Sequence, residues 1–325
     1  MRRVKSREEG QEEGIVVLWV LGMMTVMFGM LGFVVDVGIA RQERRELQNG
    51  ADAGALAMAQ ECALGLCTNL VAKAQPYANS NSIDGTSTVT GVSLPTGSSV
   101  KVDTRTRTTG GATSLTTKFA YLFGRPSTSV TATATAAWGA PGGGTAVPLT
   151  ISYCQWKSLT GNGTTYPTAN LTIFFHDPSP ATSCSGPAGQ TTPGGFGWLN
   201  STSCVSTITS GGQVGSDPGN SAPQGCSPAQ VPLNTDLLIP VFQTVTGTGN
   251  NAVYTIYGLA TFHMLSRRLG GNGNQWTSNP APPNPPCTNA DRCIYGFFVK
   301  DIIPWTGGPI GGGPNLGTLA VKLTA

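Results

Sequence analysis

The sequence is poor in the side chains that enzymes use for acid–base chemistry. Its 325 residues contain two histidines, no glutamate follows Glu61, and seven aspartates occur after that residue. Charged residues make up 11% of the chain, against about 25% in an ordinary soluble domain. Too few carboxylates remain for glycoside hydrolysis, and the motifs of serine hydrolases, zinc proteases and nucleotide-binding loops do not occur. We therefore expect no catalytic activity and no cofactor.

Positive charge is also scarce beyond the N-terminal region. The formal net charge is +3, and 15 of the 35 charged residues lie within the first 60 positions. No Lys/Arg-rich stripe follows residue 45, which argues against a nucleic-acid partner. A hydrophobic content of 39% with six tryptophans is enough to bury a core, so general disorder is excluded.

The eight cysteines all follow residue 60. An even number at such positions is typical of disulfides formed in an oxidising compartment. Short loops favour the pairs Cys62–Cys67 and Cys287–Cys293. The other four allow three connectivities, which the sequence alone does not resolve, and our preference is Cys184–Cys204 with Cys154–Cys226. No CxxC motif occurs, so we predict no zinc or other metal site.

A run of 21 residues, Ile15–Val35, carries no charge. As a helix it would span the hydrocarbon core of a bilayer, about 30 Å, and it is apolar on all sides, unlike an amphipathic core helix. A cleaved secretory signal is the alternative, because Gly38-Ile39-Ala40 is a small-x-small triplet, but such signals have shorter apolar cores. We predict an uncleaved anchor whose lipid-facing residues include Ile15, Trp19, Phe28, Phe33 and Val35.

The orientation of this anchor is inferred from the cysteines. Four Lys or Arg residues precede the run and three follow it closely, so the positive-inside rule decides little. An oxidising exterior suits the eight cysteines better than the cytosol. We expect a single-pass cell-membrane protein with residues 1–14 as a cytoplasmic tail and the C-terminal region outside the cytoplasm, the lipid bilayer being one partner.

The residues that follow the apolar run carry a more specific pattern. Asp36-Val37-Gly38 leads into an arginine cluster, then Leu-Gln, then Ala-Asp-Ala. Residues 10–60 thereby resemble the N-terminal segment of the TadE/TadG-like family of Flp (tight-adherence) pilus assembly proteins. In that family an apolar helix runs into VDVG, a charged turn and LQ-x-AADAAALA, and Gly50 and Gly54 here replace alanines. The motif residues are Asp36, Gly38, Arg44, Arg45, Leu47, Gln48, Ala51, Asp52 and Ala55.

The resemblance implies a non-enzymatic, membrane-anchored component of Flp pilus assembly, with other Tad/Flp assembly proteins as partners. Pilins similar to TadE are cleaved after a glycine that has glutamate five positions later. Here the fifth position is Trp19 after Gly14, or Ile15 after Gly10, which favours an uncleaved, TadG-like protein.

These residues also have a physical interpretation. Asp36 suits the headgroup boundary, where a carboxylate is solvated. The small residues that follow Leu47 would let a helix or a sheet approach closely. That face could pack on the chain's own domain or bind a partner.

Residues 15–60 are expected to form one transmembrane and juxtamembrane helix, and residues 61–140 a small α+β region. Within it we predict helices over 69–79 and 115–123, and strands over 100–107 and 129–138, from their apolar spacing. Arg105 and Arg107 indicate a solvated strand face more than an anion site.

Residues 141–144 are predicted to be a linker, because they read Pro-Gly-Gly-Gly. Beyond it, residues 145–325 alternate strand-like segments with Pro, Gly and Asn clusters, which favours a disulfide-tied, mainly antiparallel β-sandwich-like domain. The fold class is therefore α+β.

We expect the β-rich part to be a structural or adhesive module. The alternative is a membrane-anchored carbohydrate- or surface-binding protein without a pilus role, which would bind cell-surface glycans. Its stacking platform would consist of Phe196, Trp198 and Trp276, although cores use aromatics more often. The two histidines, His176 and His263, are expected to be structural.

Overall fold

A computed structural model describes residues 9–175, 177, 182–217, 222–270, 276–288, 291–305 and 307–324. Within the first helix, side chains are described from Val16 onward. The chain divides into two compact units. The first comprises residues 1–136 with 323–325, and the second comprises residues 137–322.

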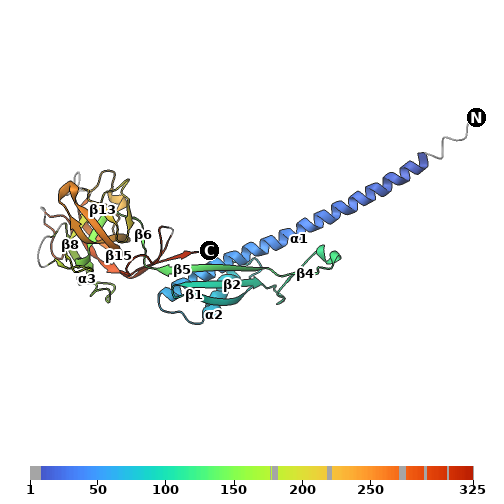
Figure 1. The fold of residues 1–325 in the computed structure, drawn as a ribbon, viewed down its shortest axis with the longest axis horizontal. Coiled ribbons are helices and arrows are strands. Elements are labelled where there is room, and N and C mark those ends of the chain that lie inside the picture. The colour runs from blue at the N-terminus through green and yellow to red at the C-terminus, as the bar shows by residue number, and fades with distance from the viewer. Residues whose placement is uncertain are drawn as a thin grey trace, which may run out of the picture. The chain divides into compact units, whose positions relative to one another are not determined.

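The first unit is built along one helix, α1 (Glu9–Ala63) (Figure 1). No proline interrupts its 55 residues, and at 1.5 Å per residue the helix is about 80 Å long. Side chains from Val16 to Val35 are almost all exposed, whereas residues from Leu47 onward are repeatedly buried. The same helix therefore has a bare half and a packed half.

The packed half of α1 buries a stripe of small and apolar residues at intervals of three and four, the spacing of one helix face. The stripe consists of Leu47, Ala51, Ala55, Met58, Ala59 and Cys62. It faces a second helix, α2 (Leu70–Ser80), whose Ala74 and Ala78 are buried.

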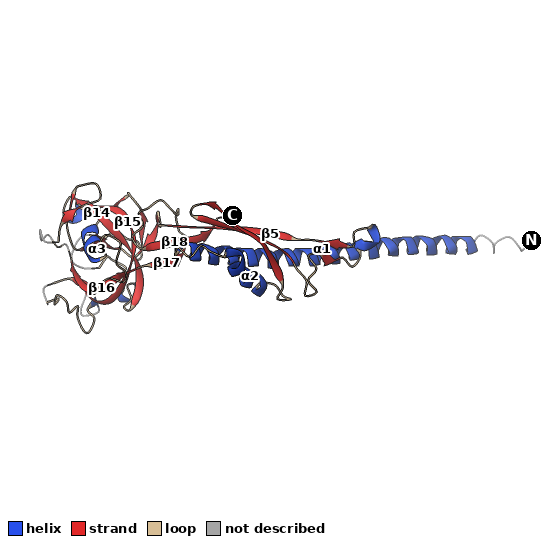
Figure 2. Cartoon of the chain, turned by 90° about the horizontal axis from the view of Figure 1, so that it is seen from below, coloured by secondary structure: helices blue, strands red, loops and turns tan. Residues whose placement is uncertain are grey.

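A sheet completes this unit, with the strand order β1 (Ser87–Thr96), β2 (Ser99–Thr106) and β5 (Thr131–Gly139). β2 and β5 turn alternate residues inward, as half-buried strands do, and β5 lies alongside α1 (Figure 2). The predicted helix over 69–79 and strands over 100–107 and 129–138 correspond to α2, β2 and β5.

The helix predicted over 115–123 is wrong. This segment forms a hairpin of two short strands, β3 (Leu115–Thr116) and β4 (Ser127–Thr128), closed by one 3₁₀ turn, η1 (Ala120–Phe123). Gly124 ends the turn with φ +76°, and Pro126 cannot continue a helix. Apolar spacing predicted a packed helix, but the unit buries none of the η1 side chains.

The second unit is dominated by a mixed sheet of seven strands. Its order is β11 (Phe196–Trp198), β7 (Leu149–Ser152), β14 (Thr235–Thr246), β15 (Val253–Arg268), β16 (Cys293–Val299) and β8 (Leu171–Phe174), and β13 (Gln213–Gly215) also pairs with β15. β14 and β7 are parallel, and the other pairs are antiparallel.

Smaller elements surround this sheet. Two-stranded sheets are formed by β6 (Gly143–Ala146) with β12 (Ser206–Thr209), and by β9 (Cys184–Ser185) with β10 (Thr191–Thr192). β17 (Asp301–Pro304) and β18 (Thr318–Leu323) pair with each other in parallel. The helical elements are α3 (Tyr153–Leu159), η2 (Pro228–Gln230) and η3 (Gly249–Asn251). The predicted α+β class with a sheet-rich C-terminal region is confirmed.

Residues 141–144 are not a linker. Gly143 and Gly144 begin β6 and pair with Thr209 and Ile208. A Cβ on Gly143 would lie 2.6 Å from the carbonyl oxygen of Ile208, and one on Gly144 would lie 2.7 Å from the Trp305 ring. Gly143 and Gly144 therefore allow neighbouring backbone and side chains to pack closely. A glycine-rich composition predicts a flexible linker and a closely packed strand equally well.

Four disulfides tie the chain. Cys62 bonds Cys67 and Cys287 bonds Cys293, as their spacing predicts. The favoured connectivity of the other four is wrong, because Cys154 bonds Cys184 and Cys204 bonds Cys226. The β9–β10 hairpin places Cys184 opposite Thr192, and the next carbonyl, that of Pro193, accepts a hydrogen bond from the Ser152 hydroxyl. Because Ser152 is two residues before Cys154, this hydrogen bond places the hairpin, and with it Cys184, beside Cys154.

Candidate functional site

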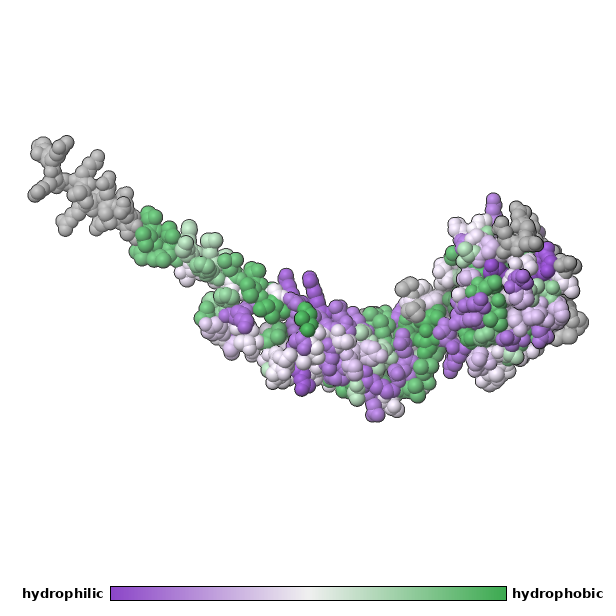
Figure 3. Space-filling model, turned by 180° about the vertical axis from the view of Figure 1, so that it is seen from behind, coloured by the Kyte–Doolittle hydropathy of each residue, from purple (hydrophilic) through white to green (hydrophobic). Residues whose placement is uncertain are grey.

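The bare half of α1 is long and apolar enough to cross a membrane, and its side chains are exposed. The predicted lipid-facing residues Trp19, Phe28, Phe33 and Val35 are all exposed, from 46% at Val35 to 71% at Trp19. The side chain of Ile15 lies outside the described residues. Figure 3 shows this part of the helix as a hydrophobic band. Exposed apolar surface on this scale is typical of a membrane or protein contact.

Asp36, the first residue after the apolar run, binds the β3–β4 hairpin (Leu115–Thr128). Its carboxylate accepts hydrogen bonds from the backbone N–H groups of Lys118 (2.7 Å), Phe119 (2.9 Å) and Ala120 (2.6 Å). These are free donors at the start of the η1 turn, so Asp36 caps it from another part of the chain. Sequence analysis placed Asp36 at a boundary but did not find this contact.

The charge of Asp36 is stabilised by this arrangement. Desolvation raises the pKa of the carboxyl group, but the three backbone donors and the nearby Lys118 together lower the pKa below its ordinary value. A lowered pKa means that the bonded, ionised form is present at neutral pH and is lost only as the pH falls through that lowered value.

Gly32 provides the second contact between the hairpin and α1. A Cβ at this position would lie 2.4 Å from the Phe119 ring and 2.7 Å from the Cβ of Phe119. The ring therefore rests directly on the helix backbone, which only glycine permits. By contrast, a Cβ on Gly22 or Gly29 would meet no atom within 4 Å.

The inward face of the motif is used by the chain's own fold. Leu47, Ala51 and Ala55 are buried, and the carbonyl of Leu47 accepts a hydrogen bond from the Thr104 hydroxyl of β2. The amide of Gln48 donates to the Asp52 carboxylate (2.8 Å) and to the carbonyl of Thr133 in β5 (3.1 Å).

Gly50 and Gly54, which replace alanines of the family pattern, explain how closely the layers approach. A Cβ on Gly50 would lie 3.0 Å from the Cα of Ala78 in α2. On Gly54 it would lie 3.5 Å from Val102 and 3.7 Å from Ala74. The small-residue face therefore packs on α2 and the sheet and is not open to a partner.

The outward face of the motif is free. Gly38, Arg44 and Arg45 are exposed, as is Arg41, and a Cβ on Gly38 would meet nothing within 4 Å. Within the described chain, no carboxylate lies within 4 Å of these three arginines. We call Arg41, Arg44 and Arg45 the arginine stripe.

Comparison with known protein families identifies the segment that forms most of α1. Residues 14–61 match the family model Tad, described as putative Flp pilus-assembly TadE/G-like. This segment is TadE/G-like. It coincides with α1 from just before the apolar run to the end of the packed half, and it associates the chain with Flp pilus assembly. No curated protein and no solved structure matches the chain.

The aromatic platform proposed for glycans is wrong. Phe196, Trp198 and Trp276 are at most 5% exposed and belong to the core of the second unit. Trp198 meets Trp276 edge to face at 6.2 Å, and Arg267 lies over the Trp276 ring. The proline and glycines that precede Phe196 are typical of a loop. The structure instead places Phe196–Trp198 in strand β11 of the main sheet.

The second unit contains an apolar cavity of about 370 Å³. Phe242, Val245, Ala252 and Tyr254 line it, and burial raises the pKa of Tyr254 to about 12.

His263 does not line this cavity. Its ring is hydrogen-bonded to Asp236 (2.6 Å) and stacked on Phe297, while His176 lies outside the described residues. No cluster of three metal-ligating side chains occurs in the described part of the chain.

Proposed function

We propose that this chain is a membrane-anchored, non-enzymatic component of the Flp pilus assembly system. The observation that carries the proposal is that the TadE/G-like segment and α1 are the same element. Its first half presents an apolar surface to the surroundings, and its second half is integrated into a folded unit. An anchor that leads without interruption into a folded unit suits a fixed subunit of a membrane assembly.

The anchor is retained in the mature protein under this proposal. Gly32 and Asp36 contact residues 118–120, and both precede the triplet Gly38-Ile39-Ala40, the alternative signal-cleavage site. Cleavage there would separate the hairpin from its binding residues. Mass spectrometry of the mature protein should find an N-terminus before residue 15, and a start at Arg41 would contradict an uncleaved anchor.

Residues 1–14 lie in the cytoplasm, residues 15–35 span the membrane, and the residues that follow lie outside the cytoplasm. All eight cysteines beyond residue 60 form disulfides, which supports an oxidising compartment. The disulfide-tied second unit is then the exposed structural or adhesive module.

Other Tad/Flp assembly proteins bind the outward face of α1. The arginine stripe supports this, because its three side chains are exposed and take no part in packing. Two of them, Arg44 and Arg45, belong to the family motif. Guanidinium groups form bidentate bonds with carboxylates, so an acidic surface on the partner is expected.

The test is a triple alanine variant of Arg41, Arg44 and Arg45 in a piliated host. We expect normal abundance and membrane fractionation, with loss of co-purifying assembly proteins and of pili. A matched control replaces three cations elsewhere in the same unit, Lys101 and Arg105 of β2 and Arg107 directly after it, and should leave assembly intact. Normal piliation of the triple variant would contradict the docking face, and normal piliation after deletion of the chain would contradict the assembly role.

A further inference from the structure

The tip of the β3–β4 hairpin exposes four large apolar side chains. Phe119, Tyr121, Leu122 and Phe123 are 40%, 54%, 66% and 78% exposed, and no charged residue lies between them. Phe119 rests on Gly32 of α1, but more than half of the surface of each of the other three is left uncovered by the described part of the chain. A cluster of this kind is uncommon on a surface that faces only water.

The tip lies beside the apolar half of α1 and not beside its packed half. Phe123 lines a groove together with Thr25, Gly29, Met30 and Phe33 of the apolar run. Thr25 is ten residues before Val35, which corresponds to about 15 Å along the helix. The hairpin is therefore level with the half of the run that is nearer to Asp36.

Most of the backbone N–H groups around the tip have hydrogen-bond partners within the protein. Backbone groups in hydrocarbon need internal partners. Asp36 binds the first three N–H groups, of residues 118–120. The N–H groups of Leu122, Gly124 and Arg125 donate to the carbonyls of Phe119, Tyr121 and Ala120, respectively.

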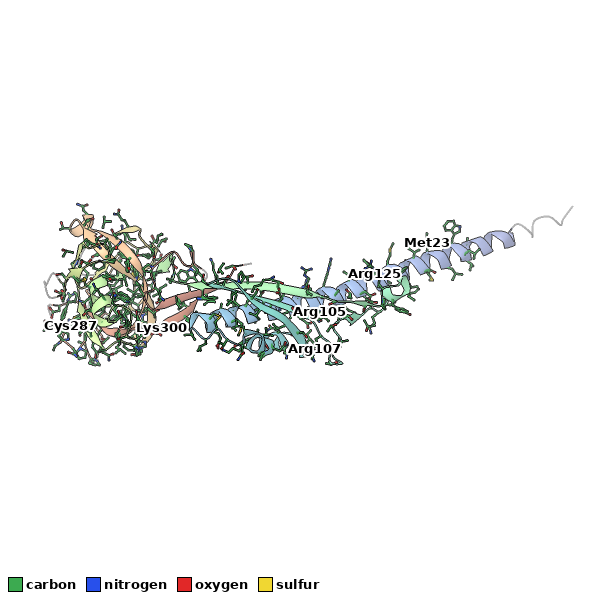
Figure 4. All side chains as sticks on the ribbon, turned by 60° about the horizontal axis from the view of Figure 1, so that its bottom comes forward. Met23, Arg105, Arg107, Arg125, Cys287 and Lys300 are labelled. Atoms are coloured by element: carbon green, nitrogen blue, oxygen red, sulfur yellow. A yellow bond between two sulfur atoms is a disulfide. The ribbon has the colours of Figure 1, made fainter. Side chains whose placement is uncertain are left out.

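The charges that flank the tip suit a phosphate layer. Lys118 precedes the apolar residues and Arg125 follows them, and Figure 4 shows Arg125 beside α1, with Met23 farther along the bare helix. Long cationic side chains at such positions extend toward lipid headgroups while their stems stay in apolar surroundings.

We propose that the β3–β4 hairpin is a second membrane-inserting element, whose tip Phe119–Phe123 enters the same leaflet as the neighbouring half of α1. Lys118 and Arg125 bind the phosphates of that leaflet. The inference rests on the proposed function, in which α1 spans the bilayer. Lipid is the occupant because the tip continues the exposed apolar surface of α1 and is bordered by cations on both sides.

Insertion at this point fixes the anchor in two ways. The hairpin sets the depth of α1, because Asp36 and Gly32 hold it at one height on the helix. It also sets the rotation of α1 about its axis, because one side of the helix carries the hairpin. An anchor of a single helix lacks both constraints.

The test uses single cysteine variants of the full-length protein in vesicles of phosphatidylcholine and phosphatidylglycerol. All native cysteines are in disulfides, so an introduced cysteine is the one free thiol for a spin label. Phe123→Cys is compared with Ile83→Cys, an equally exposed position of the same unit at 78%, and with Phe28→Cys in the apolar run. Collision of the label with oxygen and with a water-soluble nickel chelate reports its depth.

The expected result is a several-fold higher ratio of oxygen to nickel collision at Phe123 than at Ile83, close to that at Phe28. Leu122→Cys provides a second reading at an exposed site. Lipid-like values at Phe28 with water-like values at Phe123 and Leu122 would overturn the hairpin inference and leave the anchor intact. Water-like values at Phe28 would overturn the anchor, and the hairpin inference with it. Low collision with both reagents at Phe123 would show a protein occupant and overturn the lipid assignment.

Discussion

The two halves of α1 use the same secondary structure for opposite purposes. From Val16 to Val35 the helix has mostly large apolar side chains that are exposed, whereas the residues that it buries from Leu47 to Cys62 are mostly small. Large side chains gain most from lipid contact, and small ones permit close approach of a second layer. Side-chain size along one helix therefore separates the part that faces the surroundings from the part that faces the fold.

The largest effect on stability is expected from a charge introduced into the packed half of α1. Leu47→Asp would bury an unpaired carboxylate beneath β2, and we expect the first unit to lose about 3 kcal/mol or more. Thermal unfolding in detergent micelles measures the loss. Asn49→Asp, at an exposed position two residues on, should change stability little. Equal effects would mean that Leu47 is not part of a core.

A bulky residue in place of a glycine tests how close the layers are. Gly50→Val places methyl groups against the backbone of Ala78, and we expect a cost of about 1–3 kcal/mol from overpacking. The same substitution at Gly38, where space is open, should cost nothing or stabilise slightly, since glycine is a poor helix residue. Similar melting temperatures for the two variants would contradict the close approach at Gly50.

Asp36→Ala tests the contact at the junction of the two halves. Without the carboxylate, the N–H groups of residues 118–120 lose their partner, and their hydrogen exchange should accelerate several-fold while the sheet stays protected. Asp52→Ala, which removes a contact with Gln48 alone, is the control on the same helix. Unchanged exchange at the hairpin would show that Asp36 does not hold it.

The smallest effect is expected from Gly32→Ala. The added methyl group would displace Phe119, whose ring and Cβ lie within 3 Å of it, and should raise hairpin exchange less than Asp36→Ala because the three hydrogen bonds remain. Gly29→Ala adds the same methyl group one turn earlier in open space. The two variants should differ in the protection of residues 118–120 and in nothing else.

Much of the fold could be predicted from local patterns. The apolar run, α2, β2 and β5 follow from periodicity, and the TadE/G-like segment follows from a motif confined to one helix. The short disulfide Cys62–Cys67 follows from proximity in sequence. Each of these rests on residues near one another in the chain.

What could not be predicted depends on distant residues. Asp36 meets its partners more than 80 positions later, and the pattern of residues 115–123 is equally compatible with a packed helix. The pairing of Cys154 with Cys184 depends on the β9–β10 hairpin. Phe196, Trp198 and Trp276 are compatible with a surface or a core, and only the main sheet places them inside.

The uninterrupted course of α1 has a mechanical consequence. Because the helix has no proline and no break between Glu9 and Ala63, there is no hinge between the apolar run and the sheet of the first unit. Under the proposed function, in which the apolar run spans the bilayer, a twist applied to the anchor turns that sheet by the same angle, and a sideways pull on the sheet tilts the anchor. An anchor of this kind, inserted as proposed, would act with the first unit as one lever that transmits force across the membrane boundary.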